Sequence, residues 1–592
     1  MSALQCLLAC FMLSLIALKS PCLGTGSASC SLQIGKVWLH TYTGVIVCND
    51  VTEDMLYGWT LTIRFGKAPL NLLLWNVVEI EDPNNDPLVK MYEDNKYNAK
   101  LLSGESLYIP FKSDYNGSLP EVQGEITLTK KITPGITTPA ATVAPTGTTQ
   151  KPTNYDYNDV LKKSIRFYDA QRSGLLPDND IPWRESCFLD DTCFGHDLTG
   201  GWHDAGDFLK FSYPMAFSVT VLSWGIVDYY DAYVAAGEAE HAVKSLKWAT
   251  DYLIKCHIAK YEFVYQVGNP GDDHLYWGRP EDFTGIRPCY TITASNPGSE
   301  VVGEAAAALA AAALAFDKVD SVLYKDYVIL LITHAKELFE FATEYRGEYV
   351  SVDGYYSAST FGDELAWAAI WLYRATNEQV YLDNATALYT EYNLKGSSYS
   401  FAWAHKKTGV QALLCKLVDF SYCVQVDKFI TNYRPGGVLT YTPKGLAYRS
   451  PWAPLRYAAG AAFIALYVAD LQTNATVAAE YKAWAKSQIH YILGDTGRSY
   501  VIGFGVNFPT RPHHRASSCP LPPEACNWGT FSDPGPNSNV LEGALVGGPN
   551  ATDVYFDDRE NYYQSEVACD YNAAFQSAVA GEFNMTEFHS NF

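Results

Sequence analysis

Three groups of residues in this 592-residue chain have types and spacings that could carry out acid–base chemistry. The first is residues 200–207 (GGWHDAGD), where only Ala and Gly separate Asp204 from Asp207. This sequence allows a tight turn that directs both carboxylates at one point. One could take a proton from a water molecule while the other holds that water. An ordinary Asp/Gly turn has the same pattern, and the motif alone favours that simpler interpretation.

The second group lies in residues 505–515 (GVNFPTRPHHR), which the prolines at 509 and 512 predict to be a loop. His513 and Arg515 are hydrogen-bond donors with few apolar neighbours, and they could hold sugar hydroxyl groups. The two adjacent histidines lack the spacing of a helical zinc motif, so we expect no catalytic metal there. A solvated polar loop is the alternative for this stretch taken alone.

The third group follows Asp557 and centres on Glu566. An apolar stripe with helical spacing starts near Ser565, a good N-cap residue, which predicts that Glu566 lies in the first turn of a helix. The helix dipole would then lower the pKa of its carboxyl group. Glu566 could act as a proton donor only if burial or nearby carboxylates outweighed that effect. A plain N-terminal glutamate of a helix is the alternative.

The elements that must position these residues change character along the chain. Residues 132–153 are rich in Thr and Pro and predict an extended spacer that carries O-linked sugar. Before it, residues 29–131 alternate apolar and polar positions, which predicts a small antiparallel β-sandwich. After it, residues 154–592 have a period of 3.6 and predict a helical barrel or solenoid. The expected helices are 158–172, 214–236, 238–257, 299–316, 321–346, 363–376, 377–391, 406–417, 420–432, 452–470, 475–492 and 564–580.

Composition narrows the class of partner. The net charge is −22 and no basic cluster is present, which argues against nucleic acid or anionic lipid and favours a neutral substrate. Aromatic residues make up 14% of the chain, which suits a protein that stacks on sugar rings. A large aromatic core explains the same number equally well.

The N-terminus predicts secretion. Residues 4–18 are apolar and small residues follow, which is typical of a signal peptide ending near residue 28. We expect an extracellular monomer with no membrane span and with local disulfides. The plausible pairs are Cys30–Cys48, Cys187–Cys193, Cys415–Cys423 and Cys519–Cys526, and the sequence leaves the connectivity open. Glycosylation sequons occur at Asn116, Asn384, Asn474, Asn550 and Asn584.

Together and in this order, the three motifs resemble glycoside hydrolase family 9, the inverting cellulases with an (α/α)6-barrel fold. The resemblance covers about residues 154–592 and extends to residues 273–281 (DHLYWGRPE) and 295–300 (SNPGSE). It implies an all-α (α/α)6-barrel catalytic domain after the small all-β sandwich. It also implies a secreted endo-β-1,4-glucanase that acts on cellulose or a related β-1,4-glucan.

Carried over by position, the resemblance makes Asp207 the catalytic base, with Asp204 helping to hold the water, and Glu566 the catalytic acid. The two carboxyl groups of an inverting enzyme should lie roughly 6.5–9.5 Å apart to admit that water. Other residues would position glucosyl units or the catalytic carboxylates; these are Asp557, His513, Arg515 and Tyr571, with His274 and Trp277 at subsites.

Residues 30–131 resemble a family 2 carbohydrate-binding module. By this resemblance Trp59 is a core residue, and Trp38, Trp75 and Tyr97 form a flat face that stacks on glucan. The alternative is that all three are ordinary core aromatics.

Some positions depart from the family pattern. His203 and Phe208 flank the Asp204 turn where relatives often have other residues, which could change substrate contacts. Residues 359–364 (STFGDE) resemble the calcium loop of some members, with Ser359, Asp363 and Glu364 as candidate ligands. However, residues 403–406 read WAHK where many relatives have Trp-Asp-Asp-Lys. We therefore predict no required cofactor and leave a structural calcium open.

The sequence alone leaves three other functions open. The protein could be a processive or exo-acting cellulase, or it could act on mixed-linkage glucan or chitosan fragments. It could also be a non-catalytic β-glucan-binding protein, although the intact acid and base argue against that.

Overall fold

The computed structural model describes residues 155–588, apart from 178, 179, 353 and 359, together with eight strands between residues 29 and 130. The chain forms two compact units, Met1–Gly147 and Thr148–Phe592. The signal segment, the spacer and the three module aromatics Trp38, Trp75 and Tyr97 lie outside the described residues.

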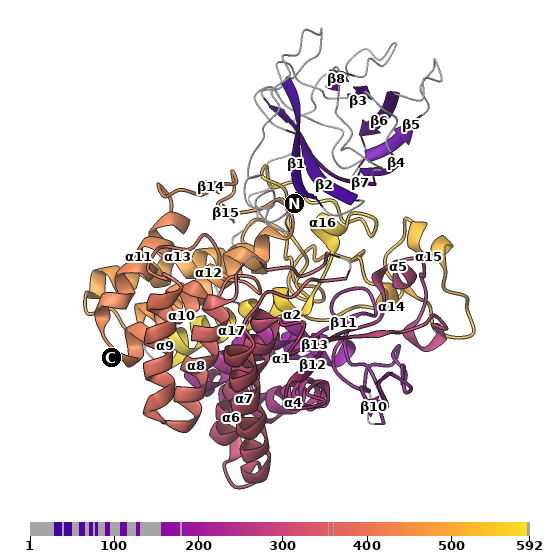
Figure 1. Cartoon of the computed structure of the whole chain (residues 1–592). Helices are drawn as coiled ribbons and strands as arrows, with labels where there is room; N and C mark the ends of the chain where they lie inside the picture. The colour runs from indigo at the N-terminus through magenta and orange to yellow at the C-terminus, as the bar shows by residue number, and fades with distance from the viewer. Residues whose placement is uncertain are drawn as a thin grey trace, which may run out of the picture. The chain divides into compact units, whose positions relative to one another are not determined.

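The strands of the first unit form two four-stranded antiparallel sheets (Figure 1). Leu61 and Ile63 pair with Leu128 and Ile126, and all four are buried, as alternating strands require. One sheet has the order β1 (Ser29–Val37), β2 (Thr41–Asn49), β7 (Leu107–Asp114), β4 (Leu70–Leu74), and the other has β5 (Val77–Ile80), β6 (Val89–Asp94), β3 (Trp59–Arg64), β8 (Ile126–Lys130).

Within the described residues of the second unit, contacts between helices close a ring of six. Each inner helix also packs against an outer one, so the helices form two concentric layers (Figure 1). This closed double layer confirms the predicted all-α (α/α)6 barrel. In ring order the inner helices are α2 (Ser212–Asp228), α6 (Ser299–Asp320), α8 (Gly362–Thr376), α10 (Lys407–Leu417), α12 (Pro454–Ala469) and α17 (Cys569–Phe588). Their outer partners are α4 (Ala239–Cys256), α7 (Lys325–Glu344), α9 (Gln379–Glu391), α11 (Cys423–Tyr433), α13 (Ala475–Leu493) and α1 (Tyr157–Ala170).

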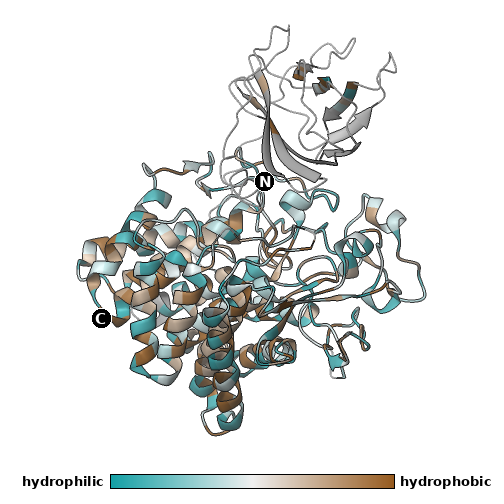
Figure 2. Cartoon of the chain, in the orientation of Figure 1, coloured by the Kyte–Doolittle hydropathy of each residue, from teal (hydrophilic) through white to brown (hydrophobic). Residues whose placement is uncertain are grey.

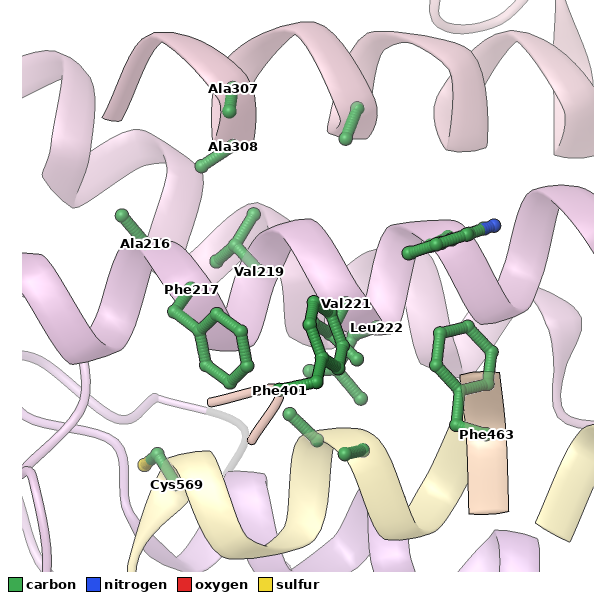
Figure 3. Close-up of a cluster of buried hydrophobic side chains, with 14 of the residues drawn as sticks. Ala216, Phe217, Val219, Val221, Leu222, Ala307, Ala308, Phe401, Phe463 and Cys569 are labelled. Carbon is green, nitrogen blue, oxygen red and sulfur yellow. The ribbon is translucent and has the colours of Figure 1, made fainter. Parts of the chain in front are cut away.

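Small side chains let the inner helices approach one another closely. Ala307 and Ala308 of α6 face Ala216 and Val219 of α2 in the core (Figure 3). The outer helices instead alternate polar and apolar residues along their length (Figure 2). Helix α6 is long and apolar enough to cross a membrane, but 94% of its apolar window is buried inside the protein, as in the core helix of a barrel.

Two features of this unit differ from the sequence-based expectations. A three-stranded antiparallel sheet of β11 (Lys210–Phe211), β12 (Glu262–Val267) and β13 (Cys289–Thr293) was not predicted, because its strands are short and pair over long sequence distances. Cys193 pairs with Cys289 rather than with Cys187, which is buried as a free thiol. The pairs Cys30–Cys48, Cys415–Cys423 and Cys519–Cys526 are confirmed.

Candidate active site

The Asp204–Asp207 turn is anchored by both other motifs. The backbone carbonyl of Asp204 accepts a hydrogen bond from Cys569 N (3.0 Å), and that of Gly206 accepts one from Arg515 N (3.1 Å). A side chain on Gly206 would overlap the carbonyl oxygen of His513. The turn is therefore packed directly against the 513–515 loop and the start of α17, which brings the three motifs together.

The two aspartates of the turn lie in different environments. Asp204 is buried, and the Tyr356 hydroxyl donates a hydrogen bond to its Oδ2. Burial raises the pKa of Asp204, the charge of Asp207 adds to this effect, and the Tyr356 hydrogen bond opposes it. Asp207 is partly exposed and lies 3.7 Å from Nε2 of His274. Asp207 is thus the aspartate more accessible to a substrate water.

His274 is held beside Asp207 by a buried ion pair one residue away. Arg515 Nη1 donates to Oδ2 of Asp273 at 2.5 Å, and Phe208 N donates to Oδ1 of the same residue at 3.2 Å. Burial lowers the pKa of His274, but the Asp207 carboxylate outweighs it and the net shift is upward. Arg515 therefore positions this segment, and its partner Asp273 could not be identified from the sequence because 242 residues separate the two.

Glu566 is not in a helix, so the predicted lowering of its pKa by a helix dipole was wrong. It is extended, between a short helix α16 (Tyr562–Ser565) and the start of α17 at Cys569. His513 N donates to Ser565 O at 2.8 Å, and Gly547 N donates to Glu566 O at 2.9 Å. These strand-like hydrogen bonds satisfy the carbonyl groups of Ser565 and Glu566, which in a helix would accept intrahelical hydrogen bonds.

The Glu566 carboxyl group has the properties of a general acid. Its Oε2 accepts hydrogen bonds from the Tyr571 hydroxyl at 2.8 Å and from Trp452 Nε1 at 3.0 Å. Burial raises its pKa to about 7, the Asp207 charge adds to the rise, and these two donors and Arg456 oppose it. A substantial fraction of Glu566 is therefore protonated near neutral pH.

The 505–515 loop carries His513, and hydrogen bonds to Asp557 hold the loop in place. The Asp557 carboxylate accepts from Thr510 N at 2.8 Å, Thr510 Oγ1 at 2.9 Å and Arg511 N at 3.0 Å. Asp557 thus holds the loop through both of its oxygens. Nδ1 of His513 lies 2.7 Å from Arg559 O, and burial lowers its pKa to about 4, so the ring is neutral with Nδ1 protonated.

Two predicted contact residues and two flanking positions are enclosed by protein. Trp277 is only 3% exposed; its Nε1 donates to Ser518 and its ring packs against His513. His203 and Phe208 are also buried, so any effect of theirs on substrate contacts would be indirect. Tyr571 contacts Glu566 rather than open solvent.

Two exposed aromatic residues at this site were missed in the sequence. Trp452 is 38% exposed beside Glu566, and Tyr355 is 41% exposed, with its hydroxyl 3.4 Å from Nδ1 of His274. Tyr355 also stacks on Phe211, at 6.0 Å between ring centres. Among 42 tyrosines and 14 tryptophans, no local pattern distinguishes these two.

The candidate calcium ligands are partly suited to a cation. The Glu364 Oε2 atom is buried without a hydrogen-bond partner, and after burial the Asp363 charge is the largest cause of its raised pKa. Against a cation, Lys406 Nζ already lies 3.2 Å from Glu364 Oε1, and Lys406 N donates to Asp363 Oδ2 at 2.8 Å. Ser359 lies outside the described residues.

The sequence that forms this barrel and its candidate site matches a known family. Residues 157–579 match the profile described as Glycosyl hydrolase family 9, which is well over half of the chain. The chain belongs to glycosyl hydrolase family 9. The prediction of a glycoside hydrolase is thereby confirmed.

Individual family 9 proteins resemble this chain over the same region. It is 41% identical to Endoglucanase A of Bacillus pumilus, over 72% of this chain and 66% of that protein, so it spans just under two thirds of that relative. An endoglucanase structure from the termite Nasutitermes takasagoensis superposes with a TM-score of 0.70 at 49% identity, covering 73% of this chain and 99% of that one. Endoglucanase CelQ from Clostridium thermocellum, complexed with cellobiose and cellotriose, has a TM-score of 0.65 at 36% identity, over 72% and 70% of the two chains.

Proposed function

We propose that this family 9 protein is an endo-β-1,4-glucanase that hydrolyses internal bonds of cellulose with inversion of anomeric configuration. The observation that carries the proposal is the Glu566 carboxyl group, whose pKa is raised to about 7 next to a turn that presents Asp207. One group can donate a proton while the other accepts one, as single displacement requires. The endoglucanase names of the relatives support endo action on a glucan, and the cellobiose and cellotriose bound to Endoglucanase CelQ support cellulose as the substrate.

These positions support the following reaction. Glu566 transfers its proton to the glycosidic oxygen as the bond to the anomeric carbon breaks. Asp207 takes a proton from the water that attacks the opposite face of the sugar, and Asp204 helps to hold that water. The products are two shorter chains, with Glu566 ionised and Asp207 protonated until solvent exchanges their protons. Trp452 and Tyr355 offer exposed rings on which glucosyl units can stack.

Product analysis tests this proposal. Proton NMR during hydrolysis of cellopentaose should show α-anomer at each newly formed reducing end, and viscosity of carboxymethyl-cellulose should fall faster than reducing ends appear. Asp207→Asn and Glu566→Gln should each reduce both signals by at least about 100-fold. Initial β-anomer would refute inversion, whereas a slow viscosity loss would indicate exo action.

We also propose that the N-terminal sheets form a cellulose-binding β-sandwich that uses Trp38, Trp75 and Tyr97. The inward alternation of Leu61, Ile63 and their partners supports a packed β core. In pull-down on crystalline cellulose, full-length Trp38→Ala and Trp75→Ala should be depleted from the bound fraction while keeping activity on soluble substrate. Unchanged retention of both variants would contradict this role.

Secretion and glycosylation are proposed from the leader and the disulfides. The N-terminal residue of protein collected from culture medium should lie near position 29, as sequencing can show. Asn474 is exposed and Asn384 is partly exposed, whereas Asn584 is buried in α17, so we expect no glycan at Asn584. Calcium at Asp363 and Glu364 is proposed only in a structural role, detectable as a rise in melting temperature with calcium relative to chelator.

A further inference from the structure

Two histidines and a glutamate from two outer helices of the barrel converge on one point. His257 is the C-terminal cap of α4, and His334 and Glu337 are three residues apart on α7, which packs against α4 (Figure 1). The Nδ1 atoms of the two histidines are 2.9 Å apart, and Nδ1 of His257 is 4.0 Å from Oε2 of Glu337. None of these side chains takes part in the acid–base site described above.

The burial of the three side chains is graded from the protein interior to the surface. The His257 side chain is 2% exposed, whereas that of Glu337 is 46% exposed. Burial lowers the pKa of both histidines. Neutral imidazole is the form that coordinates metals.

We propose that His257, His334 and Glu337 bind one divalent transition-metal ion of the zinc class, with water completing its coordination. Two imidazole nitrogens and one carboxylate are a ligand set that zinc accepts. Metal–ligand bonds of about 2.0–2.1 Å in a tetrahedron place ligand atoms about 3.3–3.5 Å apart. The observed 2.9 and 4.0 Å bracket this value, and the exposed Glu337 carboxylate can rotate to close the remaining gap.

A direct hydrogen bond between the two rings is the competing explanation. One Nδ1 would then donate to the other, and the glutamate would remain a solvated neighbour. The two explanations differ in what a metal does to the protein. An ion would join the end of α4 to α7 and would stabilise the fold by its binding free energy, whereas a hydrogen bond needs no ion.

Zinc binding to the full-length, tag-free protein tests the proposal. After treatment with chelator and dialysis, isothermal titration with zinc chloride should reveal one site in the wild type, and zinc should raise its melting temperature. His334→Ala should weaken binding at that site at least ~10-fold and abolish the thermal shift, because a direct ligand is lost. Glu337→Gln, at an exposed position that should not disturb folding, should also weaken binding.

Two controls separate this site from others. His196→Ala removes an exposed histidine in strand β10 (His196–Asp197) and should leave zinc binding unchanged. His274→Ala removes a member of the Asp207–Asp273–His274 cluster, whose ligand atoms also lie close together. The proposal is overturned if the wild type binds no zinc, if His334→Ala and Glu337→Gln bind it as the wild type does, or if only His274→Ala loses it.

Discussion

The protonation of Glu566 can be tested by removing one of its hydrogen-bond donors. Tyr571 and Trp452 both donate to Oε2, and such bonds favour the ionised carboxylate. Tyr571→Phe should therefore raise the pKa of Glu566 above the wild-type value of about 7. A hydrogen bond to a charged group contributes about 1.5–3 kcal/mol. One pKa unit corresponds to about 1.4 kcal/mol. Because Glu566 is only partly buried, we expect the lower end of this range, a rise of about 1 unit.

The pH dependence of kcat/KM on cellopentaose measures this shift in the free enzyme. The acid must be protonated to act, so wild-type activity should fall as the pH rises through about 7. In Tyr571→Phe this alkaline limb should move to higher pH by about 1 unit, even if the maximal rate is also lower. Tyr555→Phe is the matched control, because its hydroxyl lies 3.2 Å from Ser565 Oγ and no hydrogen bond from it to Glu566 is found in the described residues. An alkaline limb that stayed in place or moved to lower pH in Tyr571→Phe would refute the assignment of Glu566 as the acid.

Three further changes test the Asp204–Asp207 turn and the core. Asp207→Asn should reduce hydrolysis by about 100- to 10,000-fold while leaving the melting temperature nearly unchanged; a parallel loss of stability would indicate a structural role instead. Gly206→Ala should destabilise the protein by about 1–3 kcal/mol in urea titration, because its Cβ would overlap the His513 carbonyl, whereas Gly396→Ala, which faces open space, should not. Lys406→Met should cost about 3–5 kcal/mol at pH 7, because it leaves Glu304 and Glu364 buried without their cation. That cost should shrink as the pH falls and the two carboxyl groups take up protons, and an equal cost at pH 7 and pH 4.5 would contradict this explanation.

Local pattern was sufficient to predict the helices of the barrel. The period of 3.6 located ten of the twelve helices of the two layers to within four residues at each end, because burial of one face is recorded in the sequence of each helix. The predicted helix 214–236 is α2 followed by a separate short helix (Tyr230–Ala235), and the predicted helix 564–580 is α17, which runs from Cys569 to Phe588. The helix prediction failed in the segment just before α17, which contains Glu566. The residues around Glu566 look like a helix start, but their backbone groups bond to the distant residues His513 and Gly547. Hydrogen bonds to remote segments leave no local pattern.

The pairing of remote residues likewise escaped prediction. Cys193 bonds to Cys289 rather than to its near neighbour, and Arg515 faces Asp273 instead of open solvent. In both cases the partner is set by which loops the barrel brings to the same end.

The sequence by itself identified the candidate residues for the chemistry, because carboxylates and imidazoles in ordered motifs are recognisable whatever surrounds them. It also determined that a helical barrel or solenoid carries them. Only the tertiary structure decided that Glu566 is the group held partly protonated and that Asp557 and Arg515 serve as supports. A pKa depends on burial and on charges and donors brought in from elsewhere in the chain, and those neighbours exist only once the helices have closed into a ring.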